Sequence, residues 1–300
     1  MTPTFTPTRE KKKMWRRMRS GVRGWFDRMI SGPVAVPELR LHRKFRSQFL
    51  EPTRTLIVYV PPGYEADTHV RYPVLYMHDG QNLFDPNTAF GGNEWRLDDT
   101  AEEMIQRGAI EPLIIVGIYN TGERRIHEYT PTADPKLGGG RADLYGRMLV
   151  EEVKPFIDRT YRTLNGPENT GMGGSSLGGL VTLHLGLKYP HIFGRLAVLS
   201  PSVWWDNKVI LREIERLPAK PPLKIWLDMG TAEGEISLED TEMLRDAMRA
   251  KGWSEGDDLA YFEIEGATHS ERAWAERVGP FLQFLFPPAL VEKVELKKMS

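Results

Sequence analysis

The sequence predicts an α/β fold built on a doubly wound, mostly parallel sheet. Segments with strand-like and helix-like patterns alternate along most of the 300 residues, which favours a parallel sheet with helices on both faces. The near-continuous apolar run 112–118 is typical of a strand buried on both faces. No linker rich in Pro, Gly or Ser divides the chain, so we expect a single domain over residues 33–300 after a basic extension over residues 1–32.

The periods of the apolar residues predict the individual elements. Two strands that resemble an antiparallel pair come first, at 39–49 and 53–60. Further strands are expected at 72–77, 112–118, 170–175, 195–200, 223–228 and 259–264, and helices at 98–107, 142–161, 177–188, 238–251 and 270–286. Sites in such sheets form beyond the carboxyl ends of the strands. We therefore expect the loops at Asp79, Ser176, Ser200, Gly230 and Gly266 to gather there.

A glycine-rich stretch from Gly171 to Gly179 contains the pattern Gly174-x-Ser176-x-Gly178. Between a strand and a helix this pattern indicates a nucleophile elbow, a tight turn that lifts a serine hydroxyl above the sheet. A P-loop would need a lysine, and a dinucleotide-binding turn would need Gly or Ala where Ser176 stands. The pattern therefore predicts acyl transfer through Ser176.

A serine hydroxyl needs a base to remove its proton and an acid to orient that base. In the chain order Ser, acid, His that this kind of elbow implies, His269 is the candidate base, because it follows the strand 259–264. Three carboxylates compete as the acid, Asp228, Glu233 and Glu235. We favour Glu233, which lies past Gly230, where the strand has ended.

The tetrahedral intermediate needs N–H donors for its oxyanion, and the backbone N–H groups of Leu177 and Gln81 are the candidates. Gly80 would let the second loop turn sharply. The adjacent pairs 78–79 and 127–128 join a histidine to a carboxylate, but no pair has the i, i+4 spacing of a zinc site. There is also no cysteine. We expect no metal, no other cofactor and no nucleic-acid partner.

The formal net charge of -1 conceals a basic N-terminal segment. Residues 1–30 carry a formal charge of +7 and the remainder carries -8. Apolar residues recur there at helical spacing, so residues 9–30 could contact an anionic membrane surface, pack on the domain or fray. The segment has no apolar core of a secretory signal, and no run of eighteen apolar residues occurs. We expect a cytoplasmic protein.

Several stretches resemble the putative esterase family of α/β-hydrolases, which includes siderophore, feruloyl and acetyl-xylan esterases, S-formylglutathione hydrolase and mycolyltransferases. They are 72–85, 112–120, 128–131, the elbow and 199–205. The resemblance covers residues 38–286 and implies an α/β-hydrolase fold with a triad of Ser176, His269 and Glu233. Many members have aspartate at the position of Glu233.

The resemblance implies a serine carboxylic-ester hydrolase acting through an acyl-serine on a small-molecule ester. An acyltransferase and a non-catalytic binding protein on the same scaffold are the alternatives. The space between Ser200 and Leu223 is too short for a large lid domain, so we expect an open cleft that admits bulky sugar, siderophore or aryl esters. The resemblance implies that Trp95, Arg125, Tyr129 and Trp204 border this cleft.

Overall fold

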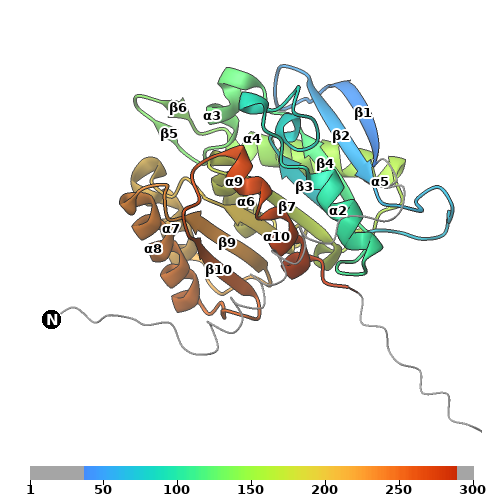
Figure 1. Ribbon diagram of the computed structural model, residues 1–300. Helices are drawn as coiled ribbons and strands as arrows, with labels where there is room; N and C mark the ends of the chain where they lie inside the picture. Colours follow the sequence, from blue (N-terminus) through green and yellow to red (C-terminus); the bar gives the residue numbers. More distant parts are fainter. Residues whose placement is uncertain (1–36, 289–300) are drawn as a thin grey trace, which may run out of the picture. The chain divides into compact units, whose positions relative to one another are not determined.

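The computed structural model describes residues 37–288 (Figure 1). Its central sheet has eight strands in the order β1-β2-β4-β3-β7-β8-β9-β10. The pairs β1–β2 and β2–β4 are antiparallel, and the other five pairs are parallel. The predicted doubly wound, mostly parallel sheet is confirmed. The predicted extension 1–32, with its membrane-contacting segment 9–30, lies outside the described residues and stays a prediction.

The strands of the sheet are short and interleaved with helices. They are β1 Glu38–Phe45, β2 Arg54–Val60, β3 Val74–His78, β4 Ile114–Ile118, β7 Thr170–Ser175, β8 Arg195–Leu199, β9 Lys224–Gly230 and β10 Leu259–Ile264. A small hairpin, β5 Ala133–Asp134 and β6 Gly138–Gly139, stands apart. The α-helices are α2 Leu97–Gln106, α3 Arg125–Glu128, α4 Ala142–Arg147, α5 Lys154–Thr160, α6 Leu177–Lys188, α7 Trp205–Arg216, α8 Glu235–Lys251, α9 Glu271–Ala275 and α10 Val278–Leu285.

Several segments differ from the sequence-based expectation, among them the helix expected at 142–161, in which a π-helical stretch, Met148–Val153, separates α4 from α5. The helix expected at 270–286 is two helices, α9 and α10, because the chain turns at Glu276 and Arg277, where the Arg277 side chain is buried. The strand expected to reach Phe49 ends at Phe45, beside a register shift and a left-handed Lys44. The segment 120–140, where no helix or strand was expected, contains α3 and the β5–β6 hairpin. The bounds of α6 and β10 agree with the prediction.

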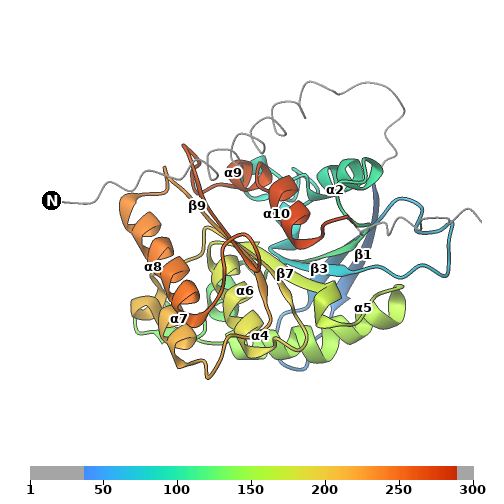
Figure 2. The same ribbon diagram turned by 90° about the horizontal axis from the view of Figure 1, so that it is seen from below.

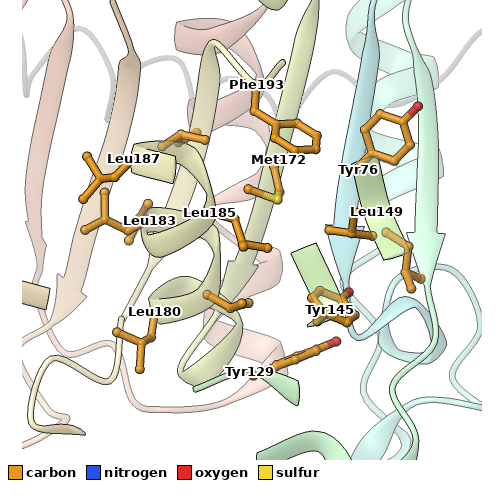
Figure 3. Packing of buried hydrophobic residues seen from close by; sticks show 14 of the residues in the cluster. Tyr76, Tyr129, Tyr145, Leu149, Met172, Leu180, Leu183, Leu185, Leu187 and Phe193 are labelled. Atoms are coloured by element: carbon orange, nitrogen blue, oxygen red, sulfur yellow. The ribbon is translucent and has the colours of Figure 1, made fainter. Parts of the chain in front are cut away.

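Helices cover both faces of the sheet. Figure 2 shows α2, α9 and α10 on one face and α4, α5, α6 and α7 on the other. Helix α6 is apolar on all sides, and ten of its twelve residues are buried, as expected of a helix enclosed by other elements. Its leucines pack beside Met172 of β7 and Phe193 (Figure 3). This packing holds the N-terminus of α6, and the residue before it, in a fixed position above the sheet.

The parallel register brings the strand ends together. His78 pairs with Ile118, and Leu199 pairs with both Ser175 and Asp228. The loops that follow β3, β7, β8, β9 and β10 therefore leave the same edge of the sheet, as expected. Only α7 lies between β8 and β9, so the described chain has no large lid domain there.

Candidate active site

Ser176 occupies a strained turn between β7 and α6, with φ 60° and ψ -124°. Such a conformation in a non-glycine residue costs on the order of 1–3 kcal/mol and persists only where the surroundings impose it. A Cβ atom on Gly174 would lie 3.0 Å from the His78 ring, and one on Gly179 would lie 2.9 Å from the carbonyl oxygen of Leu199. Small residues are therefore required on both sides of the serine. Ser175 is buried, whereas Ser176 is partly exposed.

His269 and Glu233 form a short hydrogen bond, 2.6 Å from Nδ1 to Oε2. An ionised carboxylate can only accept, so Nδ1 carries the proton and Nε2 is left as the basic nitrogen. The Glu233 side chain is 1% exposed and that of His269 is 47% exposed. The imidazole packs edge-on against Trp274, with 4.9 Å between ring centroids. The imidazole of His269 is thus half exposed, and the carboxylate of Glu233 that binds it is buried.

The pKa of Glu233 lies below its usual value. Burial raises the pKa of the carboxyl, and the hydrogen bonds from His269 and Ser200 outweigh that effect. The carboxyl is therefore ionised near neutral pH, and an ionised carboxylate can stabilise an imidazolium.

The two competing carboxylates lie elsewhere. Asp228 is fully buried at the end of β9, where it pairs with Arg277 at 2.6 Å and accepts from the indole of Trp226 at 2.6 Å. Glu235 is exposed and begins α8. Of the three, Glu233 alone contacts His269 in the structure.

The hydroxyl of Ser176 lies 3.4 Å from the hydroxyl of Ser202. Within residues 37–288 no hydrogen bond joins Ser176 to His269, an arrangement common in enzymes without a bound substrate, whose catalytic hydrogen bonds tighten on binding. Beside His269 lies a small cavity of about 30 Å³, lined also by Ser202 and Trp204. Trp204 is 51% exposed, and its neighbour Trp205 is buried.

The loop after β3 is pressed against β4. A Cβ atom on Gly80 would lie 2.5 Å from the carbonyl carbon of Gly117, so only glycine fits without moving the backbone. Asp79 before it has a left-handed φ of 55°. In the described part of the chain, the N–H groups of Gln81 and Leu177 donate no hydrogen bond to another residue. Both are thus available as oxyanion donors.

Asp79 holds this loop from beneath through an ion pair with Arg125. Nε and Nη2 of Arg125 each donate to the carboxylate at 2.8 Å, and Asn120 Nδ2 donates at 2.7 Å. Burial raises the pKa of Asp79, but the charge of Arg125 and the hydrogen bonds from Arg125 and Asn120 together outweigh it and hold the pKa below its usual value. A quarter of the Arg125 side chain remains exposed, so Arg125 can still reach a ligand.

Two of the expected pocket residues are buried. Tyr129 has no exposed surface, and its hydroxyl accepts a hydrogen bond from the Asp79 N–H at 3.2 Å. Trp95 is 3% exposed and packs against Trp274. The expectation that they border the pocket is therefore wrong, because both support the loops of the site from below.

The sequence placed the loop at Ser200 at this edge of the sheet, but it did not predict the side-chain contacts that join the loops of the site. Ser200, Arg277, Asn82 and Glu271 connect its loops through side-chain hydrogen bonds. Only Arg277 carried a sequence signal, because it stands next to a strongly apolar segment. Burial of a charge there is costly unless the charge is paired, so the position indicates a buried ion pair.

The family model described as putative esterase matches residues 47–284. The chain belongs to the putative esterase family. A curated relative, the uncharacterized protein YbbA of Bacillus subtilis, is 28% identical over 247 residues, which cover 78% of this chain and 92% of YbbA. The ferri-bacillibactin esterase BesA of the same organism is 29% identical over 201 residues, 60% of this chain and 66% of BesA.

Among solved structures, the BES protein from Bacillus cereus superposes with a TM-score of 0.66 at 22% identity. The match covers 86% of this chain and 97% of that one. The superposition supports an α/β-hydrolase fold, as predicted. Membership of the putative esterase family and relatives named as esterases make this chain an ester hydrolase.

Residues 37–288 contain neither a candidate membrane span nor a candidate metal cluster. No helix there is long and apolar enough to cross a membrane. No group of three or more His, Cys, Asp or Glu side chains there could hold a metal ion.

Proposed function

We propose that this putative esterase family member is a serine carboxylic-ester hydrolase that acts through an acyl-Ser176 intermediate. The observation that carries the proposal is the 2.6 Å hydrogen bond between His269 and Glu233 at the same sheet edge as the strained Ser176 elbow. A serine on such a turn, a histidine and a buried acid in this chain order are the components of a hydrolytic triad.

In the proposed reaction, Ser176 Oγ attacks the ester carbonyl while Nε2 of His269 takes its proton. The negative charge of Glu233 stabilises the resulting imidazolium. The N–H groups of Leu177 and Gln81 donate to the oxyanion, an interaction worth about 2.7–4 kcal/mol per donor. His269 then returns the proton to the leaving alcohol. Water, deprotonated by the same nitrogen, then attacks the acyl carbonyl; the bond to Ser176 Oγ breaks, the acid leaves, and His269 returns the proton to Oγ.

We propose a bulky ester as the substrate. The absence of a large lid domain between β8 and β9 leaves the described site open on that side. Half-exposed Trp204 borders the cavity at His269 and offers an apolar face to an aryl or sugar ring. The relative BesA is named for a siderophore ester, which supports testing this class.

A panel of acetyl, butyryl, feruloyl and trilactone esters tests the proposal. The wild-type protein should hydrolyse at least one of them, Ser176→Ala should lose that activity, and the buried neighbour variant Ser175→Ala should keep it. Hydrolysis that survives Ser176→Ala would refute the acyl-serine route. Transfer to an added alcohol in place of water would assign the protein to the acyltransferases.

A further inference from the structure

A buried polar network lies behind the triad acid. Ser200 follows β8, and Asp228 lies on β9. Trp274 lies in α9, and Arg277 immediately precedes α10. All four side chains are at most 4% exposed. Through Glu233 the network reaches the base His269.

The donors and acceptors of this network fix one hydrogen position. Arg277 Nη1 and Trp274 Nε1 lie 2.8 Å and 3.0 Å from Ser200 Oγ, and both groups can only donate. The hydroxyl of Ser200 has a single hydrogen and must direct it elsewhere. The third neighbour of this oxygen is Glu233 Oε1, at 2.6 Å. Ser200 therefore donates to the triad acid.

The two oxygens of Glu233 consequently have different partners. Oε1 accepts from Ser200 Oγ, from the Gly230 N–H at 2.9 Å and from Arg277 Nη2 at 3.3 Å. Oε2 accepts from His269. Rotation of the carboxylate would break the contacts at Oε1, so they determine where Oε2 points.

Asp228 anchors the network in turn. It binds Arg277 Nη1 at 2.6 Å, and it accepts from the Ser200 N–H at 3.2 Å through a side-chain oxygen. Ser200 has a positive φ of 41°, a conformation that a non-glycine residue rarely adopts without such constraints. Asp228 thus holds both Arg277 and Ser200 in place.

We propose that Arg277 and Ser200 are positioning residues, which present Oε2 of Glu233 to His269 while making no contact with the substrate. The proposal rests on the proposed triad. The alternative is that Arg277 serves only to neutralise the buried charge of Asp228, which would be a purely structural role.

The variants separate these roles. Arg277→Met alone leaves Asp228 buried and unpaired, so it can fail to fold. The double variant Arg277→Met with Asp228→Asn removes both charges and should fold. Arg277→Lys keeps a charge for Asp228 but has no planar fork to reach Ser200 and Glu233 as well. Ser200→Ala removes only the hydroxyl. Arg272→Met, at an exposed position of α9, is the matched control.

The measurements are kcat and KM on the best ester of the panel, the melting temperature, and the far-downfield proton resonance of the His269 Nδ1–H. We expect kcat to fall by about ten- to a hundredfold in Ser200→Ala, Arg277→Lys and the double variant, the range expected for a misplaced catalytic group. KM should change little, and the downfield resonance should weaken or vanish. Arg272→Met should match the wild type in each measurement.

A double variant or Ser200→Ala with wild-type kcat and an intact downfield resonance would overturn the proposal. The same experiment monitors the triad separately, through labelling of wild-type Ser176 by a fluorophosphonate and its loss in His269→Ala. If that labelling holds while the positioning variants stay fully active, only the positioning roles fail. If wild-type Ser176 is not labelled, the proposed triad fails, and the positioning roles fail with it.

Discussion

Asn82 Nδ2 donates a hydrogen bond of 3.0 Å to Oε1 of Glu271 and so joins two loops of the site. Asn82 ends the turn that carries Gln81, and Glu271 begins α9, two residues after His269. The proposed oxyanion donor and the proposed base are thus tied together by one side-chain contact.

This contact yields a prediction for Asn82→Ala. Without the amide, both loops lose their common support, and we expect kcat to fall by about tenfold through misplacement of catalytic groups. Steady-state kinetics check this result. Glu271→Gln, which keeps an acceptor oxygen at the same place, is the milder partner variant. Equal kcat in Asn82→Ala and the wild type would show that the two loops are held independently.

Glu233→Gln should remove most of the activity. A neutral amide cannot stabilise the imidazolium and can stabilise the wrong tautomer of His269, an exchange that lowers kcat by about 10⁴ in a comparable triad. Glu235→Gln, on the exposed first turn of α8, should leave kcat unchanged. A reversed ranking of these two variants would assign the acid to Glu235.

Gly80→Ala should disable the oxyanion loop. The added methyl group would lie 2.5 Å from the Gly117 backbone, so the loop must shift and the Gln81 N–H moves with it. Loss of one donor predicts a fall in kcat of about 10²–10³. Gln81→Ala retains the backbone N–H and should stay within a few-fold of the wild type. If Gln81→Ala were the more damaging variant, the side chain would be the working group instead.

Asp98→Asn should change the pH dependence of stability. Burial and the nearby carboxylate of Asp99 raise the pKa of Asp98 to about 7, above the value of about 3.9 in an unfolded chain. The folded state therefore binds this proton more tightly, and the resulting stability is complete below about pH 4 and lost as the pH rises through 7. The asparagine variant should gain free energy of unfolding relative to wild type between pH 5 and pH 8. Denaturant unfolding at both pH values measures it, and a difference independent of pH would contradict the assignment.

Local patterns predicted the parts of the site that follow strand ends. The elbow at Ser176, and His269 and Glu233 beyond β10 and β9, each lie where a strand signal stops in the sequence. Contacts between distant segments left no such signal. Ser200 and Arg277 are 77 positions apart and meet because α10 packs over β8 and β9.

Burial of loop residues was equally hard to predict. Tyr129 and Trp95 stand in segments without a regular period, and an aromatic side chain in a loop can face either the solvent or the core. Their burial follows from hydrogen bonding and ring packing with Asp79 and Trp274, residues far away in the chain.

The proposed mechanism depends on Ser176 acting as a nucleophile that His269 activates. Incubation of the full-length protein with a fluorophosphonate, followed by mass spectrometry of its peptides, tests it most directly. We predict one adduct, on Ser176, that forms at least about a hundredfold more slowly in His269→Ala, as expected when a general base is lost. An adduct on another residue, or equal labelling of Ser176 in both proteins, would rule out activation of Ser176 by His269.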